Sequence, residues 1–125
     1  MRHKKKKYFP GMGKVRQLIP DSPGCIVSNR IAVEGLPVRF MYRDKPCNSY
    51  DTGWCFLSGH ESDAYMNDAR NHTIFALNTI ANYDPGLIPF LGAEIGCVFE
   101  RDDSGEFVQV FDYPIPDDEE EESDD

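Results

Sequence analysis

The sequence predicts an α+β fold: a single small domain with a mainly antiparallel sheet and two short helices, between a basic N-terminal arm and an acidic C-terminal tail. Three observations support this prediction. Several short segments alternate with the period of a strand. Two positions carry the capping residues typical of helix starts. Both ends contain runs of like charge, which favour disorder. A chain of 125 residues can bury one modest core and not two.

The first half of the chain predicts two strands. Residues 25–28 form a first short strand, and residues 29–35 form a connection that ends in a glycine turn. Residues 37–43 show the clearest strand pattern of the chain. In this segment one face should carry Val38, Phe40 and Tyr42, and the other should carry Arg39, Met41 and Arg43.

The only tryptophan lies in a segment bounded by two glycine turns, at residues 51–53 and 58–59. Residues 54–58 alternate as a short strand buried on at least one face. Because Trp54 and Phe56 share a face, we expect Trp54 in the core. Tryptophan is also enriched in binding interfaces, so a role as a partner-binding anchor is the alternative.

The second half predicts two short helices and a hairpin. Ser62 is a good N-cap for a helix that ends at residue 66 or 68. Residues 73–77 are assigned to a strand because they are β-branched and aromatic. Asp84 and Pro85 suit the start of a helix through residue 91, although Pro89 strains its second turn. Residues 97–101 and 106–111 form a closing β-hairpin.

Charge divides the chain into three parts. Residues 117–125 hold eight of the 22 acids, and residues 1–16 hold seven of the 13 basic residues. The body from residue 25 to residue 116 keeps 13 acids against six basic residues. We therefore predict a flexible basic arm and leader at 1–23, a folded domain at 24–116 and a disordered acidic tail at 117–125.

The N-terminus lacks the apolar core of a secretory signal, and no window reaches 18 apolar residues, so we expect a cytoplasmic protein that does not interact with membranes. The four cysteines contain no C-x-x-C pair, and we expect reduced thiols. The acidic body would repel phosphates, which argues against nucleic-acid binding by the folded domain. The basic arm could still attract nucleic acid or anionic lipid, or act as a solubilising arm.

Three groups of residues could carry chemistry. Cys47, Cys55 and His60, with His72 or an acid, could bind zinc, but their spacing matches no common zinc module, so we expect no metal and no cofactor. Ser58, Ser62 and His60 lack the geometry of a nucleophilic triad. The acids Asp51, Glu61, Asp63 and Asp68 could act in hydrolysis, form a solvated rim, or face a basic partner.

Several ordered motifs resemble the bacterial immunity protein 33 family, formerly a domain of unknown function. The resemblance covers about residues 25–110 and rests on residues 51–63, Met41-Tyr42-Arg43, Asn82-Tyr83-Asp84-Pro85, Ile95-Gly96 and Phe99-Glu100-Arg101. It implies a small cytoplasmic protein that neutralises a cognate toxin by binding it, and it implies no catalytic mechanism.

The leading hypothesis is therefore a non-enzymatic immunity-type protein that occludes the active surface of a protein toxin. The negative charge of the body favours a nuclease as that toxin. The expected partner-binding residues are Asp51, Trp54, Glu61, Asp63, Asp68 and Asp84. Two alternatives remain: a small ligand-binding or hydrolytic domain that uses residues 51–68, and a stand-alone regulatory domain.

Overall fold

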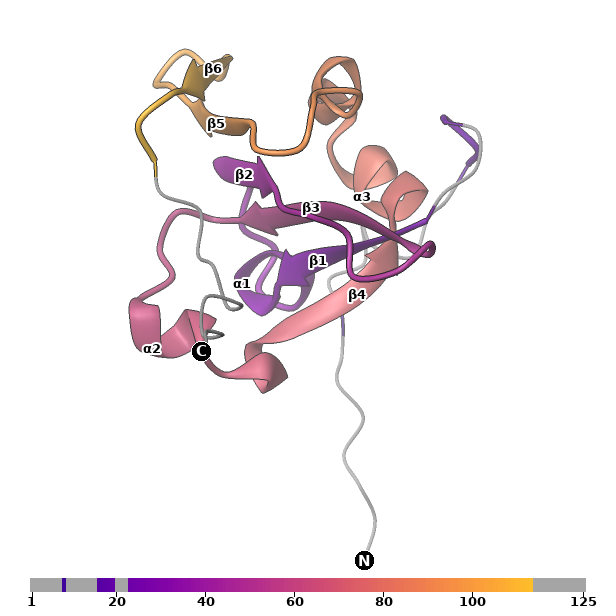
Figure 1. The fold of residues 1–125 in the computed structure, drawn as a ribbon. Helices are drawn as coiled ribbons and strands as arrows, with labels where there is room; N and C mark the ends of the chain where they lie inside the picture. Colours follow the sequence, from indigo (N-terminus) through magenta and orange to yellow (C-terminus); the bar gives the residue numbers. More distant parts are fainter. Residues whose placement is uncertain (1–7, 9–15, 20–22, 114–125) are drawn as a thin grey trace, which may run out of the picture.

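A computed structural model describes residues 8, 16–19 and 23–113 of the chain. Within this part the chain forms six strands, three α-helices and two 3-10 helices (Figure 1). In chain order they are β1 (Gly24–Ser28), α1 (Asn29–Ala32), β2 (Phe40–Arg43), β3 (Asp51–Leu57), α2 (Asp63–Met66), η2 (Ala69–Asn71), β4 (His72–Ala76), α3 (Leu77–Tyr83), η3 (Pro85–Phe90), β5 (Val98–Arg101) and β6 (Phe107–Val110). The predicted α+β class is confirmed.

The six strands form one sheet in the order β4-β1-β3-β2-β5-β6. All neighbours pair antiparallel except β1 and β3, which are parallel. The predicted hairpin is present as β5 and β6, joined by a turn in which the Asp102 side chain accepts hydrogen bonds from the backbone N–H groups of Ser104 and Glu106. The sheet is thus mainly antiparallel, as predicted.

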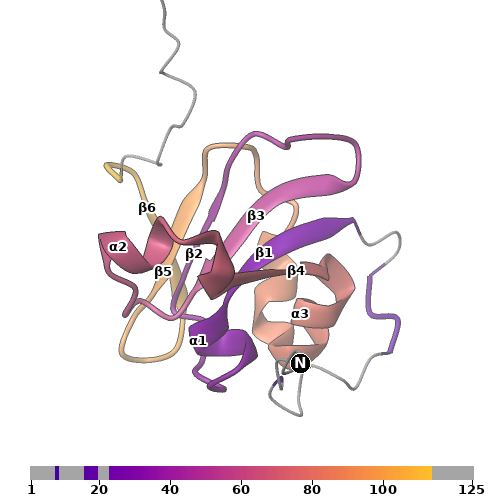
Figure 2. The same ribbon diagram turned by 90° about the horizontal axis from the view of Figure 1, so that it is seen from below.

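One face of the sheet packs against helices α1 and α3, which lie together on the same side (Figure 2). Trp54 lies in this core with none of its surface exposed, so its predicted core position is confirmed. Its indole stacks on Phe56 with ring centres 5.8 Å apart, and its Nε1–H donates a hydrogen bond of 3.1 Å to the carbonyl of Leu91. Alternation along β3 therefore directs two large aromatic residues into the core.

The first turns of the helices follow the predicted capping chemistry. The Ser62 hydroxyl accepts a hydrogen bond from the Tyr65 N–H at the start of α2. Asp84 caps the segment that begins at Pro85, but this segment is a 3-10 helix rather than an α-helix. Pro89 lies inside it and has no N–H to donate to a regular α-helical ladder.

Two short helices differ from the sequence prediction. Residues 29–32, predicted to be part of a connection, form α1 with Ser28 as its N-cap. Residues 77–83, for which no helix was predicted, form α3. The buried residues Leu77, Ile80 and Ala81 have the i, i+3, i+4 spacing of a helix face, and the strand before them ends at Ala76.

The prediction for strand β2 needs one correction. The strand begins at Phe40 rather than at residue 37, and Val38 does not share a face with Phe40 and Tyr42. Val38 packs in the main core with Met41, whereas Phe40 and Tyr42 belong to a cluster on the opposite face. Because Val38 precedes the strand, the alternation does not extend to it.

Most of the predicted basic arm and the predicted acidic tail lie outside the described residues. Residues 16–19 are described, and they contact α3. The side-chain oxygen of Asn78 accepts a hydrogen bond of 2.9 Å from the Leu18 N–H, and the Asn82 amide donates one of 2.7 Å to the Arg16 carbonyl. The Tyr8 ring also meets the Phe75 ring of β4 edge to face, with centroids 5.4 Å apart, so described residues of the predicted arm contact the domain. None of the described helices has the length and hydrophobicity required to cross a bilayer.

Candidate functional site

The face of the sheet opposite α1 and α3, here called the open face, carries a row of apolar side chains across all six strands. Strand pairing places these residues side by side in the order Ile74, Ile26, Cys55, Tyr42, Val98 and Val110. Their exposure differs along the row. Cys55, Tyr42 and Val98 are buried, whereas Ile26 is 39% exposed and Ile74 is 75% exposed.

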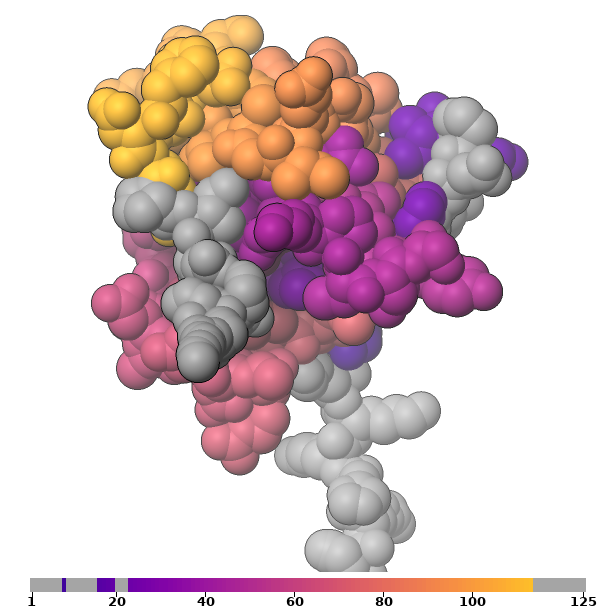
Figure 3. Space-filling view, in the orientation of Figure 1, coloured from indigo at the N-terminus to yellow at the C-terminus, as the bar shows by residue number. Residues whose placement is uncertain are grey.

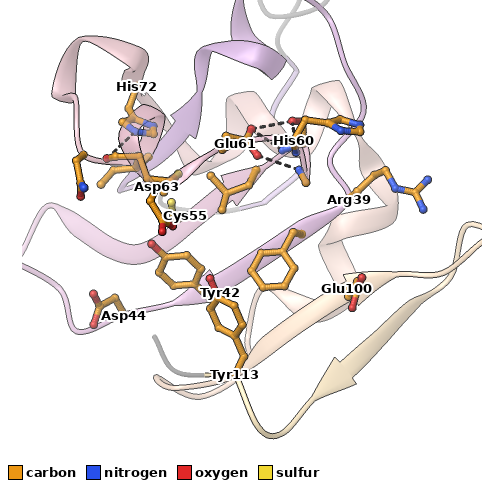
Figure 4. A pocket seen from close by; sticks show the side chains of 17 residues that line it. Arg39, Tyr42, Asp44, Cys55, His60, Glu61, Asp63, His72, Glu100 and Tyr113 are labelled. Carbon is orange, nitrogen blue, oxygen red and sulfur yellow. Dashed lines mark hydrogen bonds between the residues drawn. The ribbon is translucent and has the colours of Figure 1, made fainter. Parts of the chain in front are cut away.

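A cavity of about 950 Å³, here called the hollow, opens on this face. Its floor is formed by β2 and β3, and one wall is formed by the segment from Ser58 to Asn67, which includes α2. The space-filling view shows the α2 segment and the β5–β6 segment at opposite borders of this face (Figure 3). Figure 4 shows the lining of the hollow and labels part of it, namely Arg39, Tyr42, Asp44, Cys55, His60, Glu61, Asp63, His72, Glu100 and Tyr113.

Aromatic rings cluster at the floor of the hollow. The rings of Phe40 and Tyr113 meet edge to face with centroids 4.8 Å apart, and Tyr42 and Tyr113 are 6.4 Å apart. Burial raises the pKa of Tyr42, and the neighbouring Cys55 raises it further. Burial is also the main reason that the pKa of Cys55 rises to about 12. Both groups are therefore protonated at neutral pH, which suits a binding floor better than a nucleophile or base.

Glu61 holds the turn that leads from β3 into α2. Its carboxylate accepts hydrogen bonds from the Ser58 N–H (2.9 Å), the Ser58 hydroxyl (2.8 Å) and the Gly59 N–H (3.0 Å). Burial raises the pKa of Glu61, but the hydrogen bonds from Ser28 and Ser58 outweigh burial and bring the pKa below its ordinary value. Glu61 is thus a fixed negative charge beside the hollow, and its hydrogen bonds position the wall of this cavity.

Two of the predicted site residues are used in turns elsewhere in the fold. The Asp51 carboxylate accepts hydrogen bonds from the backbone N–H groups of Cys47 and Gly53, so it closes its own turn at the start of β3. Asp84 forms an ion pair of 2.8 Å with Arg101, and both side chains are mostly buried. Neither residue lines the hollow.

The remaining predicted site residues lie in three different environments. Asp63 is exposed in the first turn of α2 and lines the hollow together with Glu61. Asp68 is paired with Arg70 at 2.8 Å, and hydrogen bonds from Arg70 lower the pKa of this carboxyl to about 2. Trp54 is buried in the core on the other side of the sheet. The structure therefore brings together Glu61 and Asp63 and separates them from the other four.

Sequence analysis did not identify Asp44, Glu100 and Tyr113 as part of a site. Glu100 reaches the hollow because β5 pairs with β2, which places Glu100 opposite Phe40. Asp44 follows β2 directly, and Tyr113 follows β6 by three residues. The alternation of residues 40–43 could have identified the face, but the strand order was needed to join these side chains.

The arrangement of the other candidate groups offers little for catalysis. Among the described residues, no three His, Cys, Asp or Glu side chains are grouped so that they could hold a metal ion. Cys47 is exposed in the loop before β3, while Cys55 is buried on the sheet. The Ser58 hydroxyl donates its hydrogen bond to Glu61, and its oxygen accepts one from the His60 backbone N–H.

These features define a small α+β domain whose open sheet face carries an acidic, aromatic hollow. The family model described as "Immunity protein Imm33 domain" matches residues 25–111, and the chain belongs to this family. The resemblance seen in the sequence is thereby confirmed. No curated protein and no solved structure matches the chain.

Proposed function

We propose that this protein is a non-enzymatic immunity protein that binds a cognate protein toxin and occludes its active surface. The observation that carries the proposal is the open face of the sheet in a member of an immunity protein family. This face exposes apolar residues, including Ile26, Ile74 and the 50% exposed Val108, around a large hollow. Contiguous exposed apolar surface with a polar rim is typical of protein–protein interfaces.

Charge supports a nuclease as the target. The body of the chain has 13 acids against six basic residues. Many toxins that cleave nucleic acids hold their substrate in a basic groove, and an acidic protein would be steered to such a groove and compete with phosphates. Association should therefore slow as salt rises, while dissociation changes less.

The expected partner-binding residues contribute in different ways under this proposal. Asp63 lines the hollow in the first turn of α2, and Asp68 lies outside the hollow, just before η2. We assign both to the rim of the interface. Glu61 positions the wall of the hollow, and Asp51 and Asp84 maintain turns. Trp54 supports the sheet from its core side, because its buried indole presents no surface to a partner.

The test is co-expression with a toxin encoded at the same locus, followed by purification. A stable complex of fixed ratio supports the proposal. The variant Ile74→Asp, which places a charge in the apolar row, should weaken the complex by about tenfold or more if Ile74 lies within the interface. The matched control Ile95→Asp changes another exposed isoleucine, which lies before β5, and should leave affinity within about twofold.

Two results would contradict the proposal. If no complex forms with the toxin and cells are not protected, the protein is not its immunity partner. If protection occurs at far below equal amounts of the two proteins, the protein acts as an enzyme on the toxin or on its product. Circular dichroism of both isoleucine variants checks that the fold is intact.

A further inference from the structure

The hollow combines aromatic ring faces with negative charge. Tyr113 is 39% exposed and contacts Phe40 and Tyr42, so these three rings form an aromatic floor that a ligand can reach. The face of an aromatic ring carries negative electrostatic potential and attracts cations. Figure 4 shows Tyr42 and Tyr113 on one side of the hollow and Glu61 and His60 on the other.

Acids outnumber basic residues in the lining. Asp44, Glu61, Asp63 and Glu100 contribute four carboxylates, and Arg39 contributes the only arginine or lysine among the lining residues described. The Arg39 guanidinium donates a hydrogen bond of 3.3 Å to the Arg101 carbonyl and lies 4.0 Å from Asp103, which is outside the lining. The net charge of the hollow is therefore negative.

Two of the four carboxylates have no partner inside the described part of the chain. Neither the Asp63 carboxylate nor the Glu100 carboxylate forms a hydrogen bond or an ion pair with the described residues. The negative charges of nearby acids act on the tyrosines of the aromatic floor. Burial raises the pKa values of Tyr42 and Tyr113, and the nearby charges of Asp44 and Asp63, respectively, raise them further. A cation bound against these rings would be attracted by the nearby carboxylates as well as by the ring faces.

We infer that the hollow receives an arginine side chain from a segment of the toxin, with its guanidinium against the rings of Tyr113 and Phe40 and near Asp63 and Glu100. This inference rests on the proposed function. Arginine fits better than lysine because a planar guanidinium both stacks on aromatic rings and forms paired hydrogen bonds with carboxylates. At about 950 Å³ the hollow also accommodates neighbouring residues of the segment.

A titration with a small probe tests the hollow without the toxin. N-acetyl-L-argininamide is added to the full-length protein, and the resonances of the Tyr42 and Tyr113 rings are followed by NMR. The neutral control is N-acetyl-L-citrullinamide, which has nearly the same shape. We expect saturable shifts of both rings with the arginine probe and none with the citrulline probe at about 50 mM, a concentration suited to a millimolar site.

Matched variants separate the hollow from the general negative charge of the chain. Asp63→Asn with Glu100→Gln should weaken probe binding by about tenfold, since each exposed charge partner contributes up to about fivefold. The control, Glu94→Gln with Glu106→Gln, removes the same charge outside the hollow and should change binding by less than about twofold. Because the shifts are assigned to individual residues, they also distinguish probe bound in the hollow from probe bound at the acidic tail.

Three results would overturn the inference. The first is that the arginine and citrulline probes shift the tyrosine ring resonances equally, or that neither probe shifts them. The second is equal weakening by the two variant pairs. The third is probe binding only after residues 2–7 are deleted, which would show that the chain's own basic arm occupies the hollow. If the probe does not bind but the protein still forms a complex with the toxin, only the arginine inference falls and the proposed function stands. If the protein forms no complex with the toxin, the proposed function falls.

Discussion

The sharpest stability prediction concerns Trp54, which should be essential to the fold. The side chain is fully buried between the sheet and the segment that follows α3. It stacks on Phe56 and packs against Phe99, with ring centres 6.3 Å apart, and its indole N–H hydrogen bonds to the Leu91 carbonyl. Trp54→Ala removes all of these interactions and leaves a large cavity.

Truncation of a buried tryptophan to alanine costs about 3–5 kcal/mol. Full burial and three kinds of lost contact place Trp54 in the upper part of this range. A typical domain is stable by about 5–15 kcal/mol, so Trp54→Ala should remove about a quarter or more of the free energy of unfolding. Trp54→Phe keeps most of the ring packing but leaves the Leu91 carbonyl without its donor, which costs about 1–3 kcal/mol.

Urea unfolding followed by far-UV circular dichroism measures both variants. Tryptophan fluorescence is unsuitable because Trp54 is the only tryptophan in the chain. The midpoint should fall in the order wild type, Trp54→Phe, Trp54→Ala, with little change in the denaturant slope. A loss below about 1 kcal/mol for Trp54→Ala would refute the assignment of Trp54 to the centre of the core.

Three further predictions follow from the local geometry. Gly53→Ala should destabilise the fold by about 2 kcal/mol or more, measured by urea unfolding, because φ is +87° and a Cβ would overlap the Asp44 carbonyl oxygen; unchanged stability would contradict that geometry. The folded pKa of Glu61 is lowered, so its stabilising effect is complete above the pKa of the unfolded chain and is lost as pH falls through the folded pKa. The stability difference between wild type and Glu61→Gln should therefore shrink below about pH 4, and a difference that grows on acidification would be inconsistent with this assignment. In the native protein a thiol reagent should modify the exposed Cys47 quickly, and Cys25 and Cys55 only after unfolding, because burial raises the pKa of both thiols; fast labelling of Cys55, found by mass spectrometry, would argue against the closed floor of the hollow.

Much of the fold could be predicted because local chemistry determines it. Alternation placed Trp54 and Phe56 in the core, and the Ser62 hydroxyl marked the start of α2. The helix at residues 77–83 was missed because its apolar residues continue directly from an apolar strand. The strand ends at Ala76 and the helix begins at the next residue, Leu77, so no turn residue marks the change from strand spacing to helix spacing.

The hollow could not be predicted, because it depends on strand order. Phe40 lies between Leu57 and Glu100 only when β2 pairs with both β3 and β5. The roles of the acids also depended on distant partners. Asp84 pairs with Arg101, 17 positions away, and Glu61 takes a hydrogen bond from Ser28 at the end of β1. Sequence alone treated all six predicted site residues as one group, although only Glu61 and Asp63 line the hollow.

The most direct test of the central claim is a titration of toxin activity with increasing amounts of this protein. If the protein neutralises the toxin by occluding its active surface, activity should fall linearly and reach zero at a fixed molar ratio. Raising the salt concentration should slow the approach to inhibition more than it speeds recovery. Complete loss of activity at a small fraction of that ratio, or full activity in excess protein, would contradict inhibition by binding.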